Sequence, residues 1–364
     1  MVLRCSKFVL PETIPHISFD ENGVCNYCRE YDENMNNVKI NYDLKGKRFE
    51  GFINEVVGKR AQKGSSYDVL VPVSGGRDSS YVAWELSKNL RILCVHYDNP
   101  FSSSQTKVNV DRLTKTIKSD IVSFSHPNNR HVKSFKANLR AWLKSPQLAT
   151  MGLMCLACKP MYLEFFKIAR RNDIPLIVDG SNPNEATTFK IEAQGGRGTK
   201  SLFSWKAMTN VGGKATRNWR YFRTCNFIPA IHTLLSLNGN TPYLRWKYPD
   251  IYKIGYFYFY PYHEKTINEC LRDIGWEKAR DNKSPWRFDC EIDSLKNYLF
   301  QKVIGANEKD DLFSKNIRWG LMTREEAMNR LEEGEVNIEI VERVLSKVNM
   351  KLSALQLPEN KNKE

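Results

Sequence analysis

The chain has 364 residues, of which 41% are hydrophobic and 12% aromatic, so it can bury a core large enough for more than one subdomain. Its 55 Lys and Arg exceed its 41 Asp and Glu, and the net charge of +14 favours anionic partners such as nucleotides, nucleotide sugars, RNA or an acidic protein. The N-terminal MVLRCSKFVL has no apolar core of signal-peptide length, and no stretch approaches about 18 apolar residues. These features exclude a membrane-spanning helix and predict a cytoplasmic protein without membrane insertion.

Three regions are expected along the chain. They are a cysteine-bearing segment with a charged linker (1–62), an α/β core (63–262) and a helical region (263–364). Within the core, four apolar runs alternate with segments of helical periodicity: 68–73, 90–97, 121–124 and 175–179. This alternation predicts a doubly wound parallel sheet, whose ligands bind outside the carboxyl ends of the strands. The aromatic run 256–260 predicts one further buried strand.

The first region contains a candidate zinc knuckle. Cys25 and Cys28 form a CxxC in the glycine turn DENGVCNYCREY, and Cys5 can supply a third thiolate. The fourth ligand is unknown, because Phe8 stands where an RCxxC arrangement would place a cysteine. His16 or a more distant cysteine could complete the site, and a packed turn without metal is the alternative.

The stretch VPVSGGRDSSYVAW (71–84) joins the first core strand to a helix through two glycines. Such a turn brings unpaired backbone N–H groups and the positive end of a helix dipole to one point, where an anion binds. A turn that binds nothing has the same local pattern. The hexapeptide SGGRDS (74–79), however, resembles the SGGxDS pyrophosphate loop of the N-type ATP pyrophosphatases, the PP-loop superfamily, and it matches neither the Walker nor the dinucleotide glycine pattern.

This resemblance implies an enzyme that binds ATP and Mg²⁺, releases pyrophosphate and transfers AMP to an oxygen of its substrate. The ATP-binding residues that it implies in the loop are Ser74, Gly75, Gly76, Arg77, Asp78, Ser79 and Ser80. Asp78 is also an implied catalytic residue. Polar residues after the second and fourth strands resemble further nucleotide-contacting positions of the superfamily. We assign Asp98 to contacts with the adenosine of ATP. Contacts with the phosphates or Mg²⁺ are assigned to Gly180, Asn182 and Glu185.

A second CxxC, Cys155 to Cys158, lies between the third and fourth core strands. With Cys225 it could hold zinc or an iron–sulfur cluster near the ATP, as three cysteines do in some thiolating relatives of this superfamily. It could instead complete a four-cysteine site with the N-terminal CxxC, or form a buried pair of thiols without a ligand. The other cysteines of the core and the helical region are predicted to be packing residues: Cys94, Cys270 and Cys290.

Beyond residue 262, the segments EKTINECLRDIGW and TREEAMNRLEEG predict amphipathic helices, the second with a capping box of Thr323 and Glu326. Two stretches that combine glycines with basic residues, 195–200 and 212–217, are either mobile loops that close over an anionic substrate or solvated connections.

Four separated blocks resemble the N-acetyl sugar amidotransferase family. In order, from near Arg4 to about Glu333, they are RCSKFVLPETIPHISFDENGVCNYC, SGGRDSS, CLACK and RFDCEIDSLKNYLFQKVIGANEKDDLFSKNIRWGLMTREEAMNRLEEG. The resemblance implies a nucleotide-linked N-acetyl sugar as substrate and an acetamidino group as product, in bacterial surface-polysaccharide (LPS O-antigen) or nonulosonic acid synthesis. Phe8 departs from the family's pattern, which affects the zinc site more than the catalysis.

The same resemblance implies that a separate glutaminase and a channel protein supply ammonia. The chain itself has Val2 where such a glutaminase has its nucleophilic cysteine. Lys159, Arg318 and Arg324 are candidate contacts to a substrate anion, and Lys159 is also a candidate catalytic residue. The main alternative is a PP-loop tRNA thiolation enzyme that uses the second CxxC for a cluster or a persulfide. No dedicated RNA-binding module is recognisable, so nucleic acid is not the expected partner.

Overall fold

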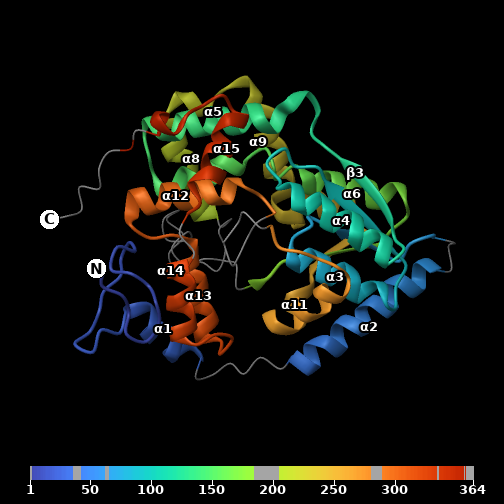
Figure 1. The fold of residues 1–364 in the computed structure, drawn as a ribbon. Helices are drawn as coiled ribbons and strands as arrows, with labels where there is room; N and C mark the ends of the chain where they lie inside the picture. Colours follow the sequence, from blue (N-terminus) through green and yellow to red (C-terminus); the bar gives the residue numbers. More distant parts are fainter. Residues whose placement is uncertain are drawn as a thin grey trace.

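The computed structural model describes residues 2–35, 42–61, 65–183, 205–279, 289–333, 336–355 and 357 (Figure 1). Five strands form one parallel sheet in the order β3-β2-β1-β4-β5. Their bounds are β1 Val69–Pro72, β2 Ile92–Tyr97, β3 Asp120–Phe124, β4 Leu176–Asp179 and β5 Tyr252–Gly255. The chain moves outward from β1 to β3 and then crosses to β4 on the other side, so the sheet is doubly wound. The predicted α/β class and parallel sheet are therefore confirmed.

The side chains of the central strand β1 alternate between two apolar cores. Val69 and Val71 face a core shared with α2, α3, α4 and α11, whereas Leu70 faces a core shared with α6 and α10. These helices are α2 Tyr42–Ala61, α3 Arg77–Ser87, α4 Ser104–Thr116, α6 Met161–Arg171, α10 Pro242–Lys247 and α11 Glu264–Asp273. Because both faces of the sheet are covered, its inner strands have nearly continuous apolar sequences.

A third core joins the N-terminal segment to later helices, with Cys5, Cys28, Trp142, Leu299 and Val344 in one buried cluster. Its helices are α1 Asn26–Met35, α5 Arg130–Lys144, α12 Ile292–Ile304 and α15 Ile338–Lys347. The other described helices are α8 Trp205–Thr216, α9 Thr224–Ser236, α13 Glu308–Arg318 and α14 Arg324–Glu333, with the short turns η1 Pro127–Asn129, η2 Leu148–Cys155, η4 Trp219–Tyr221, η5 Leu237–Gly239, η6 Tyr256–Tyr258 and η7 Leu352–Ala354. Among the described helices, none combines the length and the apolar character needed to cross a membrane. The region boundaries at 62 and 262 stay predictions, since the flanking helices α2 and α11 both pack on the sheet.

The predicted strand at 256–260 is wrong, because the sheet's last strand, β5, ends at Gly255 and the aromatic run folds into the turn η6. The rings of Tyr256 and Tyr260 stack with centroids 4.6 Å apart. In a strand, residues four positions apart would be about 13 Å apart. The strand that the sequence analysis missed is β5 itself, whose short YKIG sequence has too little apolar character to predict.

Candidate functional site

The glycine loop lies at the carboxyl end of the central strand β1 and leads directly into α3. Its own side chains close the turn: the Ser74 N–H donates to Ser79 Oγ at 3.1 Å, and the Gly76 N–H donates to Ser74 Oγ at 3.2 Å. No described side chain caps the N-terminus of α3, so the N–H groups of its first turn have no such partner. Together with the helix dipole, such N–H groups favour an anion, and a phosphate cradle at this loop stays a prediction.

Two glycines allow the close packing on which this cradle depends. Gly75 has a φ of +78°, and a Cβ there would lie 2.2 Å from the carbonyl oxygen of Thr106. A Cβ at Gly180, directly after β4, would lie 3.0 Å from the backbone nitrogen of Ser79. Gly180 therefore lets the end of β4 pack against the start of α3. This packing role explains the glycine, and its contact with a phosphate stays a prediction.

Asp78, in the first turn of α3, is held by two donors. The Tyr262 hydroxyl donates to Asp78 Oδ1 at 3.0 Å, and Arg77 Nε donates to the same oxygen at 3.2 Å. Arg77 Nη1 also donates to Glu264 Oε1 at 2.6 Å, and Arg330 Nη1 donates to Glu264 Oε2 at 3.0 Å. The carboxylate of Asp78 is therefore fixed at one end by a chain of ion pairs that reaches α11 and α14.

The electrostatics of this chain keep Arg77 and Glu264 charged. Burial disfavours the charge of Arg77, but neighbouring Tyr262, Asp78 and Glu264 hold the pKa of its guanidinium above its ordinary value. Burial likewise opposes ionisation of Glu264, yet Arg77 and Arg330 hold the pKa of that carboxyl below its ordinary value. The sequence analysis missed Tyr262, Glu264 and Arg330. No local motif marks them, because they lie more than 180 residues from the loop and are brought to it only by the fold.

The other predicted nucleotide residues have different environments. The Ser80 side chain is completely buried, and its contact with ATP stays a prediction. Asp98 follows β2 and pairs with Lys107 at 2.8 Å, while Asn182 follows β4 and is buried. Contacts of Asp98 and Asn182 with a nucleotide stay predictions. Glu185 lies outside the described residues.

Arg318 and Arg324 lie against the N-terminal segment. Arg324 donates from Nε to the carbonyl oxygen of Phe8 at 2.9 Å and from Nη2 to that of Cys5 at 3.3 Å. The guanidinium carbon of Arg318 lies 4.9 Å from the ring centroid of Phe8 and 5.6 Å from that of Tyr31. Both guanidinium groups thus pack on the N-terminal segment, and the contact of these two arginines with a substrate anion stays a prediction.

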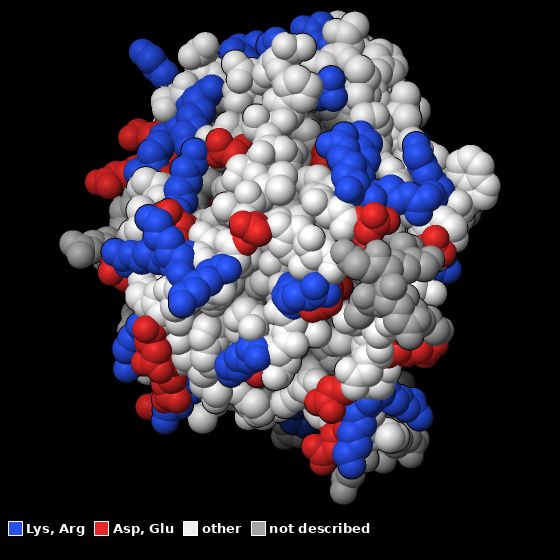
Figure 2. Space-filling model, turned by 90° about the vertical axis from the view of Figure 1, so that its right-hand side faces the viewer, with Lys and Arg blue, Asp and Glu red and all other residues white. Residues whose placement is uncertain are grey.

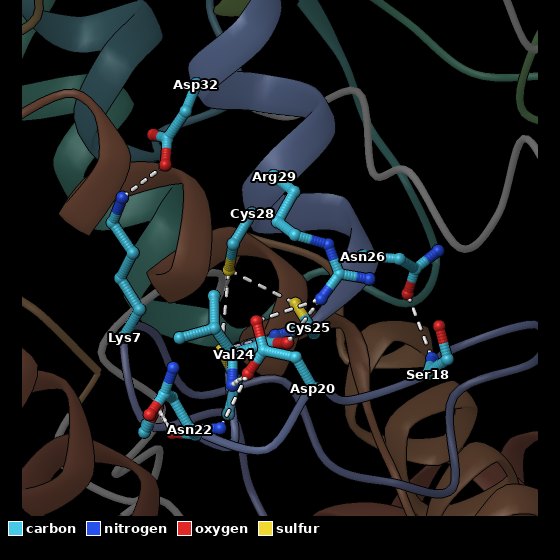
Figure 3. A network of polar contacts seen from close by, with 12 residues as sticks. Lys7, Ser18, Asp20, Asn22, Val24, Cys25, Asn26, Cys28, Arg29 and Asp32 are labelled. Carbon is cyan, nitrogen blue, oxygen red and sulfur yellow. Dashed lines mark hydrogen bonds and ion pairs between the residues drawn. The ribbon is translucent and has the colours of Figure 1, made fainter.

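The N-terminal cysteines form a completely buried group at the start of α1. The sulfur of Cys28 lies 3.1 Å from that of Cys25 and 3.4 Å from that of Cys5 (Figure 3). The turn before α1 is shaped by Asp20, whose Oδ1 accepts the Val24 N–H at 2.9 Å. Zinc holds thiolate sulfurs about 3.8 Å apart in a tetrahedral site. A small expansion of this group would therefore accommodate the ion.

The fourth position of this site stays open. The three sulfurs lie within 4.8 Å of one another, and among the described residues no other His, Cys, Asp or Glu joins them at that distance. His16 is exposed and outside the group, and neither Cys155 nor Cys158 belongs to it, so the suggestions that one of these completes the site are wrong. Phe8 is buried, and its N–H lies 3.5 Å from Cys5 Sγ.

Zinc is expected to bind this group more tightly as the pH rises. Hydrogen bonds from Cys25 and Cys5, together with burial, raise the pKa of the Cys28 thiol, and this thiol must lose its proton to bind the metal. The apparent affinity should rise about tenfold or more per pH unit near neutrality, measured by competition with a chromophoric chelator. Cys28→Ser should abolish binding, whereas Cys94→Ser, at a buried thiol within β2, should not. A zinc affinity that changes neither with pH nor in Cys28→Ser would contradict the assignment of these cysteines as zinc ligands.

Cys155 and Cys158 lie beside Cys290. Burial, and then the neighbouring Cys155 and Cys158, raise the pKa of the Cys290 thiol strongly. Asn99, after β2, donates to Cys290 Sγ at 3.3 Å. The sequence analysis assigned Cys290 to core packing alone and so missed this neighbourhood. Cys225 lies at the start of α9, where its thiol is 3.8 Å from a backbone carbonyl oxygen of α5, and its membership of this group stays a prediction.

This second thiol group lies close to the glycine loop. A Cβ at Gly76 would lie 3.3 Å from Cβ of Asp289, the residue before Cys290. The described cysteines of this group do not all lie within 4.8 Å of one another, so their spacing is wider than one tetrahedral zinc ion requires. Lys159, which follows the CxxC, lies with Nζ 6.0 Å from the ring centroid of Tyr162, and its catalytic and substrate-binding roles stay predictions.

The same end of the sheet carries a buried neutral histidine. His131, on α5, lies with Nδ1 2.9 Å from the Tyr97 hydroxyl. Burial, followed by the charge of His126, lowers the pKa of His131 to about 3. Below about pH 6.5 the unfolded chain binds a proton at His131, whereas the folded chain does so only near pH 3. The contribution of His131 to the free energy of unfolding is therefore constant above about pH 6.5 and is lost as the pH falls towards 3.

His131→Gln is expected to reduce the slope of the free energy of unfolding against pH between pH 6.5 and about 4. The expected reduction is about 1.4 kcal/mol per pH unit, which corresponds to one proton fewer taken up on unfolding. Urea unfolding at several pH values measures this slope. The matched control is His16→Gln, at an exposed histidine, which should leave the slope unchanged. Equal slopes for His131→Gln and the wild type would show that His131 is not kept neutral by the fold.

Three solved structures to which the chain is similar are distant in sequence. No protein-family model matches the chain, and no curated protein matches it. NMN synthetase from Francisella tularensis aligns with a TM-score of 0.33 and 10% identity over 89% of this chain and 100% of that one. The U34-tRNA thiolase NcsA from Methanococcus maripaludis, solved with its [4Fe-4S] cluster, gives 0.32 and 12% over 99% of both chains. The NH3-dependent NAD synthetase from Campylobacter jejuni gives 0.28 and 14% over 66% of this chain and 99% of that one. With TM-scores this low, any function proposed for this chain depends on the residues of its own site.

Proposed function

We propose that this chain is an ATP-dependent enzyme of the PP-loop type that splits ATP between its α and β phosphates. One observation carries the proposal: an uncapped helix N-terminus, a closed glycine turn and a carboxylate held by Tyr262 and Arg77 meet at the carboxyl end of the central strand. The N–H groups of α3 suit a pyrophosphate, and Asp78 supplies the hard oxygen ligand that Mg²⁺ prefers. Bound Mg²⁺ would neutralise charge that develops on the phosphates.

The proposed reaction replaces the carbonyl oxygen of an acetamide with nitrogen. The amide oxygen attacks the α-phosphorus, the bond to the β-phosphate oxygen breaks, and pyrophosphate leaves. Ammonia then adds to the carbon of the O-adenylyl imidate, and the C–O bond breaks to release AMP, which carries the former amide oxygen. The chain's part is to align the amide with ATP and to stabilise the leaving phosphate charge, so no protein nucleophile is required.

The proposed substrate is a nucleotide-linked N-acetyl sugar, and the proposed ammonia source is a separate glutaminase with a channel protein. Support for both comes from the four sequence blocks that resemble N-acetyl sugar amidotransferases. The structure adds one physical reason for these blocks: the first contains Cys5 and Phe8, and the last contains Arg324, whose guanidinium binds the carbonyl groups of both. Distant parts of the resemblance thus meet in one unit.

The test is pyrophosphate release from ATP and Mg²⁺ in the presence of ammonium, with UDP- and CMP-linked diacetamido sugars compared with bulk tRNA. Release with a sugar, and a product in which NH has replaced O by mass spectrometry, would establish the amidotransferase. Glutamine should be a poor nitrogen donor for the purified chain. Efficient use of glutamine by the chain alone would contradict the separate glutaminase, and release only with tRNA would contradict the sugar substrate.

A second candidate, a tRNA thiolation enzyme, is favoured by the second thiol group. Cys155, Cys158 and Cys290 lie next to the glycine loop, where a cluster or a persulfide would be near an adenylated base. Against this candidate, the face shown in Figure 2 has its Lys and Arg interleaved with Asp and Glu. A surface that follows a nucleic-acid backbone has a continuous basic tract instead.

Cys290→Ser is expected to separate the two candidates. If the group holds a cluster or carries sulfur, anaerobically reconstituted protein should lose most of its iron and sulfide, or its tRNA-dependent activity, in Cys290→Ser. Cys270→Ser changes a partly buried thiol on α11 outside this group and is the matched control. If sugar-dependent pyrophosphate release is unchanged in Cys290→Ser, the thiol group takes no part in the amidation.

A further inference from the structure

Helix α9 has its polar side chains inside and its apolar side chains outside. Successive residues of an α-helix are about 100° apart, so positions 227, 228, 231 and 234 share one face. They are Phe227, Ile228, Ile231 and Leu234, which are 53%, 46%, 55% and 56% exposed. The opposite face is buried and consists of Asn226, Pro229, Thr233 and Ser236. A helix that only had to pack on its own core would have the reverse pattern.

The buried polar face is fully built into the protein, so the orientation of α9 is fixed. Asn226 Nδ2 donates to Asn138 Oδ1 at 2.8 Å, and Ser134 Oγ donates to Asn226 Oδ1 at 2.6 Å. Thr233 Oγ1 donates to the carbonyl oxygen of Leu156 at 2.9 Å. Rotating the helix to hide its apolar face would break these bonds and bury unpaired polar groups. The apolar face of α9, defined by Phe227, Ile228, Ile231 and Leu234, is thus held towards the outside. The helix itself lies near the top of the molecule beside α5 (Figure 1).

The surroundings of this face are aromatic and uniformly basic. Trp219, just before α9 in the chain, and Trp246, on α10, which packs against α9, are 65% and 77% exposed. From residue 205 to residue 249 the sequence has no Asp or Glu, and its basic residues are Lys206, Lys214, Arg217, Arg220, Arg223, Arg245 and Lys247. None of these seven forms an ion pair with a described carboxylate. An exposed apolar helix face bordered by tryptophans and unpaired cations is typical of an interfacial membrane helix.

We propose that the apolar face of α9 docks this protein onto an anionic lipid surface. The aliphatic and aromatic side chains enter the boundary of the acyl chains, the two tryptophans lie at headgroup level, and the basic residues contact lipid phosphates. A second copy of the chain fits less well, because pairing two such faces would bring two uncompensated basic surfaces together. RNA fits less well, because three of the four side chains of the face itself, Ile228, Ile231 and Leu234, are aliphatic and gain little from contact with stacked bases. The proposal goes beyond the proposed function and does not rest on it.

The test is flotation of the full chain with vesicles of phosphatidylcholine alone and of phosphatidylcholine mixed with phosphatidylglycerol. The wild type should float with the anionic vesicles only, shift its tryptophan emission to shorter wavelength, and be released by high salt, which screens the contact. The double change Ile231→Ser with Leu234→Ser should lower the partition coefficient at least about tenfold, since each side chain loses most of its apolar burial. Arg220→Glu with Arg223→Glu should do the same without changing the apolar face.

The matched control is Val108→Ser with Ile121→Ser, which changes two aliphatic side chains exposed to 41% and 40% on α4 and β3. This control should bind vesicles like the wild type, and thermal unfolding monitors the fold of every variant. The proposal is overturned if the wild type ignores anionic vesicles or binds neutral ones equally. It is also overturned if light scattering shows a dimer that the α9 change dissociates, or if that change abolishes RNA binding while leaving vesicle binding intact.

Discussion

Asp78→Ala is expected to reduce ATP-dependent pyrophosphate release by about a thousandfold or more. The change removes the carboxylate that Tyr262 and Arg77 hold in the first turn of α3, and with it the proposed Mg²⁺ ligand. Arg77 keeps its ion pair with Glu264 at 2.6 Å in this variant, so the start of α3 should stay folded. Release is measured with saturating ATP and ammonium in the presence of the acceptor that gives the largest signal with the wild type.

The control for this change is Asp111→Ala. Asp111 is an exposed residue of α4 that pairs only along its own helix, with Lys115 at 2.7 Å, and its removal should leave the rate within about twofold. Nucleotide binding by calorimetry separates the two roles of Asp78. If the variant binds Mg-ATP normally but does not release pyrophosphate, Asp78 acts on the reaction; if it releases pyrophosphate at the wild-type rate, the proposed site is wrong.

Gly75→Ala is expected to destabilise the protein by about 2–4 kcal/mol and to abolish pyrophosphate release. The new Cβ would lie 2.2 Å from the carbonyl oxygen of Thr106, a backbone atom that can move only if α4 moves. The positive φ of 78° adds strain that only glycine avoids. Denaturant unfolding measures the first effect, and the assay described for Asp78 measures the second.

Gly51→Ala is the matched control, because Gly51 lies within α2 and a Cβ there meets no atom within 4 Å. The control should be neutral or more stable by up to about 1 kcal/mol, since alanine favours the helix and restricts the unfolded chain. A Gly75→Ala variant with wild-type stability and activity would show that the loop does not need the conformation described for it.

The local features of this protein were predictable because they depend on neighbouring residues. The strands β1, β2, β3 and β4 follow from short apolar runs between helical segments. The inner strands β1, β2 and β4 are buried, and buried parallel strands need apolar residues on both faces. The glycine loop follows from a strand, two glycines and a helix start within a few residues. Cys25 and Cys28 come together through one tight turn, and Cys5 joins them from 20 residues earlier in the same N-terminal segment.

The sequence analysis did not predict the contacts of residues whose partners lie far away in the chain. Arg318 and Arg324 carry charges that suit an anionic substrate, but the fold turns them towards Phe8 and the carbonyl group of Cys5. Ser80 belongs to the loop by sequence, yet one helical step beyond Ser79 turns it into the core.

The sequence by itself therefore determined the class of fold, the place of the phosphate cradle and the N-terminal cysteine group. Each of these depends on patterns that can be read along the sequence: the alternation of apolar and helical segments, a glycine loop, and a CxxC with a third cysteine in the same segment. The tertiary structure alone decided which groups hold Asp78, namely Tyr262 and Arg77 with Glu264 and Arg330 behind them, and which thiol lies beside the second CxxC. The physical reason is that a long-range contact depends on how whole helices pack on the sheet. The energy of that packing is spread over many residues, so no short motif records it.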